Sequence, residues 1–217
     1  LVERNLDERA LSSFFGVAAH KFTIIPGLCH GTRNTGPRLV GNDGSVEHVA
    51  ILAIARPDSA GVPRFSRDDV AILLHEFAHS FVNPHFDAQP ELVGASARAA
   101  LAAAHERLTA QAIQSPLTLV NESVVRAAVV LQLETSSGVT AARRELVTQQ
   151  ALGFSWLPDL VSLLGEYAGD RARYPHFAAF VPQVLDFFDG LGLRIPELDR
   201  GFAARQPKLV SVSATLD

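Results

Sequence analysis

Five residues near the middle of the chain, His75-Glu76-Phe77-Ala78-His79, have the spacing of an HExxH metal-binding motif. Residues four apart on a helix lie about 40° apart around its axis, so both imidazole rings can reach one ion. Glu76 points about 100° away from His75, beside the metal rather than onto it. There it can hold a water molecule and take its proton. The motif therefore predicts a zinc site with two histidine ligands and Glu76 as the general base.

The third ligand must come from elsewhere, because a catalytic zinc ion usually has three protein ligands and one open position. Glu122 is the leading candidate, since it interrupts a nearly all-apolar helix predicted over residues 117–133. A carboxylate buried there needs a compensating partner. An ion pair with Arg126, four residues later, is the alternative. The two interpretations are compatible if one oxygen of Glu122 binds the metal and the other accepts a hydrogen bond from Arg126 or Asn121.

The HExxH motif lies on a helix predicted from Ser66 to about residue 82. Ser66 and Asp69 form a variant capping box at its start, and Asn83-Pro84 is predicted to end it. At about 100° per residue, one face of this helix is apolar and the other carries His75 and His79. Beyond the first turn, that second face has almost no Lys, Arg or Glu, which favours a face that encloses a metal over one that is merely solvated.

The remaining pattern predicts a small N-terminal β portion followed by a helical body, and hence the α+β class. The two expected strands are residues 21–28 and 46–55, separated by a Gly-rich loop over 29–45. The other expected helices are 6–15, 91–113, 117–133, 140–152, 157–168 and 175–188. An irregular stretch is expected after Pro196, and residues 208–215 alternate like a strand.

The composition excludes some functions. The chain has 217 residues, 47% of them hydrophobic and 19% charged, which is typical of a globular protein with a substantial core. A net charge of −4 and the lack of a Lys/Arg cluster give no reason to expect nucleic-acid binding. The longest apolar runs, such as residues 48–55, are too short to span a bilayer. Cys29 is the only cysteine, so no intrachain disulfide can form.

An HExxH motif followed on a later helix by a lone glutamate in an NExxxR setting resembles the gluzincin metallopeptidases. The longer strings HEFAHSFVNP and NESVVRA resemble a bacterial family of zincin-like proteins classed as a domain of unknown function. The resemblance implies one zinc ion held by His75, His79 and Glu122, a catalytic Glu76, a zincin-like fold and a peptide or protein substrate. Members of that family are often exported, which favours a periplasmic or secreted protein over a cytoplasmic one.

The same resemblance sets the expected domain organisation. A single metallopeptidase domain covers residues 1–205, and residues 206–217 form a C-terminal strand or the start of a linker to a further β domain. The chain begins with Leu1 and contains no Met, for which a removed signal peptide is one explanation.

Gluzincins often stabilise the oxyanion with a Tyr or His from a downstream segment. Tyr174 is favoured here, with Tyr167 and His176 as alternatives, although each tyrosine could equally serve packing. By fold-level analogy, the strand at 46–54 is expected to be an edge strand along which substrate lies. The loop over residues 27–44 would then border the cleft, with Asn34 or His30 near the site.

Three readings from other classes remain. A zincin-like binding or structural module would keep the metal ligands without activity, but it would not require a glutamate at position 76. A di-iron protein could use Glu76-x-x-His79 as a ligand pair, but such sites need a second ExxH on another helix, and the sequence has none. A metal-free helical core with a coincidental HExxH is the remaining alternative.

Overall fold

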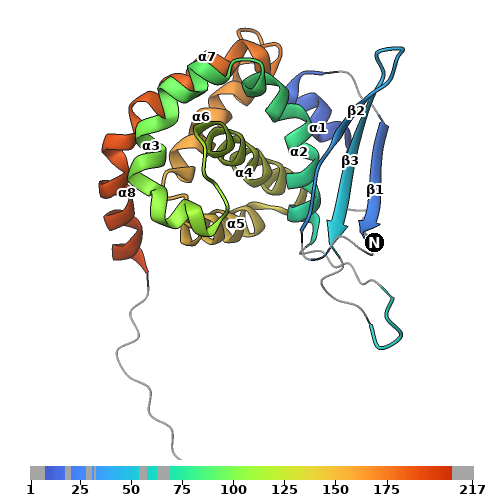
Figure 1. Ribbon diagram of the computed structural model, residues 1–217, viewed down its shortest axis with the longest axis horizontal. Coiled ribbons are helices and arrows are strands. Elements are labelled where there is room, and N and C mark those ends of the chain that lie inside the picture. Colours follow the sequence, from blue (N-terminus) through green and yellow to red (C-terminus); the bar gives the residue numbers. More distant parts are fainter. Residues whose placement is uncertain are drawn as a thin grey trace, which may run out of the picture.

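The computed structural model describes residues 8–17, 21–27, 31, 33–53, 58–62 and 69–206 (Figure 1). The expected strand at 208–215, the helix start at Ser66, and His30 and Cys29 lie outside these residues. In chain order the elements are α1 (Glu8–Phe15), β1 (Lys21–Gly27), β2 (Arg38–Val40), β3 (Val46–Ala53), α2 (Asp69–Asp87), α3 (Pro90–Ala110), α4 (Pro116–Ser137), α5 (Val139–Ala151), α6 (Leu157–Gly169), η1 (Phe177–Phe180), α7 (Val181–Asp189) and α8 (Leu191–Arg205). The expected α+β class is confirmed, with a small sheet near the N-terminus and a mainly helical remainder.

The sheet has the strand order β1-β3-β2, so β3 is its central strand. β1 pairs with β3 in parallel, from Lys21 opposite Glu47 to Gly27 opposite Ala53. β2 pairs with the other edge of β3 in antiparallel fashion, and a bridge between Thr35 and Ile51 extends that pairing. The expectation that residues 46–54 form an edge strand open to substrate is therefore wrong, because both edges of β3 are already paired.

A tight turn explains why the expected loop contains a strand. Asn42-Asp43-Gly44 is a hairpin-turn sequence, and Gly44 has the positive φ of +80° that glycine tolerates. Gly41 donates its N–H to the carbonyl of Ser45 at 2.8 Å, which closes the turn. Residues 38–40 consequently fold back onto β3 rather than extending freely.

α2 lies between the sheet and the helical body (Figure 1). Its sheet side is aromatic: Phe81 stacks on His48 of β3 at 4.2 Å between ring centroids and on Phe15 of α1 at 5.1 Å. Phe77 meets Phe22 of β1 edge to face at 5.1 Å. Phe77 is completely buried and Phe81 nearly so, so this contact provides much of the burial that holds the sheet to α2.

α4 is the central helix of the body and contacts α2, α3, α5 and α6 (Figure 1). Ser115 caps its start by accepting a hydrogen bond from the Thr118 N–H at 3.0 Å, and Pro116 occupies the first turn as predicted. Within the described residues, α4 is long and apolar enough to cross a membrane by length and composition, but 67% of that stretch is buried inside the protein. Its apolar character is thus accounted for by the core that it forms.

Two prolines do not end their helices, contrary to expectation. α2 continues through Pro84 to Asp87, and α8 continues through Pro196 to Arg205. A proline inside a helix removes one hydrogen bond at a cost of about 3 kcal/mol. The fully buried Phe86 in α2 and Ile195 in α8 offset that cost by packing in the core. The expected helix at 175–188 is divided into η1 and α7.

Candidate metal centre

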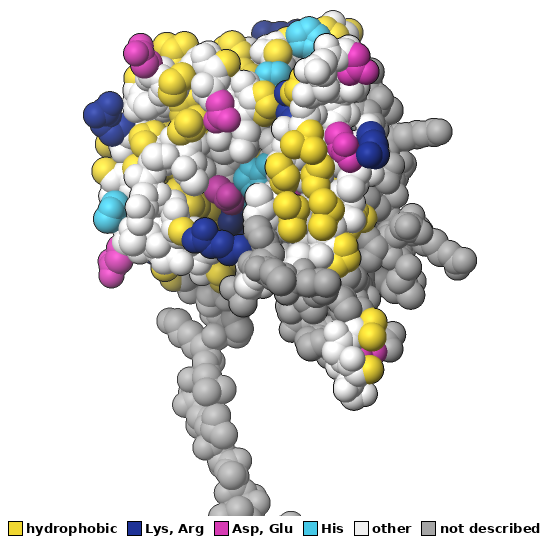
Figure 2. Space-filling view, turned by 45° about the vertical axis from the view of Figure 1, so that its right-hand side comes forward, with side chains coloured by type: hydrophobic (Ala, Val, Ile, Leu, Met, Phe, Trp, Pro, Cys, Tyr) yellow, Lys and Arg dark blue, Asp and Glu magenta, His cyan; other side chains and the backbone are white. Residues whose placement is uncertain are grey.

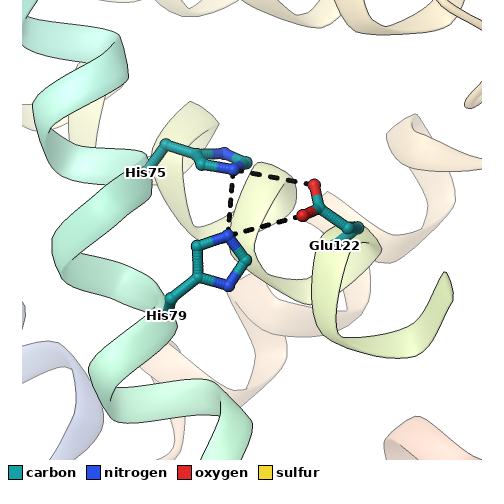
Figure 3. A group of neighbouring side chains, drawn as sticks. All are labelled: His75, His79 and Glu122. Atoms are coloured by element: carbon teal, nitrogen blue, oxygen red, sulfur yellow. Dashed lines mark hydrogen bonds and ion pairs between the residues drawn. The ribbon is translucent and has the colours of Figure 1, made fainter. Parts of the chain in front are cut away.

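Three of the predicted site residues come together between α2 and α4 (Figure 3). The Nε2 atoms of His75 and His79 are 3.1 Å apart. Glu122 Oε2 lies 3.6 Å from His75 Nε2, and Glu122 Oε1 lies 3.5 Å from His79 Nε2. The three side chains are only 15–19% exposed, so the group is sheltered but reachable from solvent.

These distances fit a single metal ion. Tetrahedral zinc with bonds of about 2.0–2.2 Å separates neighbouring ligand atoms by about 3.3–3.6 Å. The two imidazole nitrogens, 3.1 Å apart, are slightly closer than that range, and each lies 3.5–3.6 Å from one oxygen of the Glu122 carboxylate. Two imidazoles and one carboxylate are also a ligand set that zinc accepts, leaving one position open for water or substrate. His75, His79 and Glu122 could therefore hold a metal ion.

α4 positions Glu122 through a hydrogen-bonded series of side chains. Arg126, one turn later, donates to Glu122 Oε2 at 2.8 Å and also to Gln149 of α5. Gln149 in turn donates to Glu145 at 2.5 Å, and the Arg126 guanidinium lies 4.4 Å from the centroid of the Phe154 ring. The two readings of Glu122 thus coexist, because its carboxylate pairs with Arg126 while facing both histidines.

Asn83 is a site residue that the sequence interpretation missed. Its Oδ1 lies 3.1 Å from His79 Nδ1, so the Nδ1–H donates to it and leaves Nε2 with a lone pair for a metal. The signal was the same four-residue spacing that joins His75 to His79. Asn121, predicted to support Glu122, instead donates to Asp87 of α2 at 3.2 Å.

Burial shifts the acid–base properties of the motif. It lowers the pKa of His75 well below the usual range, with smaller contributions from His79 and Arg126, so this ring stays neutral and able to bind a metal. Burial also raises the pKa of Glu76 to about 7, with Glu122 adding to the effect and Arg126 opposing it. Glu76 is 6% exposed and accordingly titrates in the range that suits a general base.

A cavity of about 330 Å³ opens beside His75 and is lined by His75, Glu76, Arg126 and Asn34, among others. The space-filling view shows a hollow with a histidine at its floor, flanked by acidic and basic side chains (Figure 2). The predicted proximity of Asn34 is confirmed, although its Oδ1 accepts the Ala53 N–H at 2.8 Å. Gly36 lies so close to α2 that a Cβ would come within 1.8 Å of the Glu76 carbonyl oxygen.

The expected oxyanion donors lie in a different environment. Tyr174 packs edge to face on Phe180 at 4.8 Å. Tyr167 is fully buried against aromatic rings including Phe180 at 5.3 Å, and burial raises its pKa. His176 is exposed, immediately before η1. Among the described residues that line the cavity beside His75, none of these three occurs.

Comparison with curated proteins and with solved structures gave no match. A family described as a domain of unknown function, DUF4932, matches residues 4–187. That span covers most of the chain and contains the HExxH motif, Glu122, Arg126 and Asn83. The chain therefore belongs to the DUF4932 family.

Proposed function

We propose that this protein is a zinc-dependent peptidase of the gluzincin type, with a zincin-like arrangement of its HExxH helix and sheet. One observation carries the proposal: Glu76, with a pKa raised to about 7, lines the same cavity as the metal-ligand candidate His75. A metal site that only stabilises the fold needs no buried carboxylate at that position. Burying one costs free energy, which favours a chemical role.

Each residue of the metal centre would have a distinct role in this reaction. A zinc ion held by His75, His79 and Glu122 would supply Lewis acidity and make a water molecule easier to deprotonate. Glu76 takes the proton from the attacking water and then passes it to the leaving nitrogen. Asn83 keeps His79 in the tautomer that binds a metal, and Arg126 holds Glu122 in place.

Arg126 is our candidate for the group that stabilises the negative charge developing on the oxygen of the peptide carbonyl. It lines the cavity, and two of its nitrogen atoms are held by Glu122 and Gln149. A guanidinium has five N–H donors, so Arg126 keeps donors to spare beyond these two contacts. A fixed cation in a sheltered cavity is suited to stabilising an oxyanion.

The cavity beside the metal centre adjoins a larger one of about 740 Å³. Both are lined by Ala71, Glu145 and Thr148, so the two form a continuous depression between α2 and α5. Together they offer room for several residues of an extended peptide. We propose this depression, rather than the β3 edge, as the place where substrate binds.

Cleavage of a mixed peptide library by zinc-loaded wild type and Glu76→Gln tests the proposal. We expect new termini from wild type and at least about a hundredfold less cleavage from Glu76→Gln, since general-base catalysis contributes about 10²–10⁴-fold. Equal cleavage by both proteins would contradict the assignment of Glu76.

A catalytically silent zincin-like module is the second candidate. The observation in its favour is that Tyr167 and Tyr174 pack in the aromatic cluster and not beside the cavity. This candidate predicts zinc binding with no cleavage by either wild type or Glu76→Gln.

A further inference from the structure

A second, smaller cavity of about 150 Å³ lies on the opposite side of α2 from the metal centre. The α2 residues that line it, Ser80, Phe81, Pro84 and His85, point about 100° or more around the axis from His79. No acidic side chain of the described residues lines it. The mechanism proposed above makes no use of this cavity.

Basic side chains gather around this cavity from three parts of the chain. Arg38 of β2 is paired with His48 of β3, and directly opposed residues of an antiparallel pair project to the same face. His85 lines the cavity from α2. Burial lowers the pKa of His85 most, and electrostatic repulsion from His176 and Arg38 lowers it further. Such crowding is unfavourable unless an anion joins it.

Two buried polar side chains complete the lining. His48 is 2% exposed, and its ring stacks on Phe22 at 4.9 Å and on Phe81 at 4.2 Å between centroids. Ser80 is 3% exposed, and its hydroxyl has no hydrogen-bond partner within the described residues. A buried hydroxyl without a partner costs free energy, so a ligand that accepts a hydrogen bond would be favoured there.

We propose that this cavity binds a small inorganic oxyanion of the size and charge of phosphate or sulfate, through Arg38, His85 and the Ser80 hydroxyl. The volume corresponds to about five water molecules at about 30 Å³ each, which is room for one tetrahedral oxyanion. Guanidinium groups bind such anions with paired, charge-assisted hydrogen bonds. The proposal is independent of the peptidase function.

A bound oxyanion would join β2 to the C-terminal part of α2. Arg38 belongs to the same segment as Gly36, which lies against Glu76, and Asn34, which lines the metal-side cavity. Fixing Arg38 would therefore also fix the segment that borders the metal centre. We expect added phosphate to slow hydrogen exchange of the β2 amides, because ligand binding suppresses local opening.

Calorimetric titration with inorganic phosphate tests the site in the full chain. We expect one saturable site with the same affinity in zinc-loaded wild type and in His79→Ala, because the cavity lies across α2 from the metal. Arg38→Met should weaken binding by about tenfold or more, and Ser80→Ala by about two- to tenfold. Arg33→Met is the matched control, since Arg33 is an exposed arginine of the same segment outside the cavity lining, and it should bind like wild type.

Three results would overturn the proposal. The first is the absence of saturable binding to both wild type and His79→Ala up to about 10 mM phosphate, which would mean that the cavity holds only water. The second is equal affinity in wild type, Arg38→Met and Ser80→Ala. The third is loss of binding in His79→Ala alone, which would place the phosphate at the metal centre. Thermal unfolding of each variant shows whether it is folded. If either Arg38→Met or Ser80→Ala is not folded, the phosphate affinity of the other one tests the proposal.

Discussion

The two sides of α2 differ in what their side chains contact. Toward the sheet, Phe77 and Phe81 are buried against other aromatic rings, where they gain from the removal of apolar surface from water. Toward α4, His75 and His79 face Glu122 across a space the size of a metal ion, beside an open cavity. One side thus contributes to stability by packing, and the other places polar groups where packing alone would favour apolar ones.

The side of α2 that faces α4 is the one that carries groups suited to chemistry. Glu76 is buried with a raised pKa, which costs stability in the absence of a compensating cation. The aromatic side offsets such costs without taking part in the site. Substitutions on the two sides should consequently separate stability from metal binding.

Truncating the aromatic side should have the largest effect on stability. Phe81→Ala removes the stacking partner of Phe15 and His48 and leaves a cavity, so the free energy of unfolding should fall by about 3–5 kcal/mol. Zinc affinity, measured at a temperature at which the variant is folded, should change by less than about threefold, since Phe81 contacts no ligand. Denaturant unfolding and metal titration check the two parts. A large loss of zinc affinity in the folded variant would show that the two sides are not separable.

Glu76 should make the stability of the metal-free protein depend on pH. Its pKa is about 7 when folded against 4.5 as the reference value, so the folded state binds more protons in that window. The stabilising contribution of neutral Glu76 is therefore complete below about pH 4.5 and is lost as pH rises toward 7.

Glu76→Gln has no such dependence. The free energy of unfolding of Glu76→Gln relative to wild type should rise by up to about 3 kcal/mol between about pH 4.5 and 7. Denaturant unfolding of chelator-treated protein at a series of pH values measures this difference. A difference that stays constant with pH would contradict the burial of Glu76, and zinc should diminish the effect because a cation stabilises the carboxylate.

Asn83 should matter for the metal more than for the fold. Asn83→Ala removes the acceptor of the His79 Nδ1–H, and loss of such a supporting contact typically lowers metal affinity by about 10–100-fold. Asn121→Ala is the matched control, because Asn121 bonds Asp87 instead of a ligand, and zinc affinity should be nearly unchanged. Equal losses in the two variants would mean that a general effect on α2 and α4 is responsible.

Much of the metal centre could be predicted from local spacing. The HExxH spacing determines how His75 and His79 project from any helix, and a lone carboxylate in an apolar helix singled out Glu122. Both signals depend only on helix geometry and on the cost of burying charge. The structure confirms that these three residues converge.

The features that could not be predicted from the sequence depend instead on how separate parts of the chain pack together. Pairing of β2 with β3 depends on a turn at Asp43-Gly44, and the central position of β3 depends on which strands the whole chain brings beside it. The bond from Arg126 to Gln149 joins residues 23 apart, on different helices, so no spacing rule reveals it. The helix predicted to end at Asn83-Pro84 continues to Asp87, because burial of Phe86 offsets the lost hydrogen bond.

Zinc binding by wild type, Glu122→Ala and Glu76→Gln tests whether His75, His79 and Glu122 hold a metal ion. Metal analysis of purified protein, with equilibrium titration against a chelator, gives both stoichiometry and affinity. We expect one zinc per chain for wild type and for Glu76→Gln, and a loss of zinc affinity for Glu122→Ala greater than the about 10–100-fold typical of a supporting residue. Full zinc occupancy in Glu122→Ala would contradict the assignment of His75, His79 and Glu122 as the metal ligands.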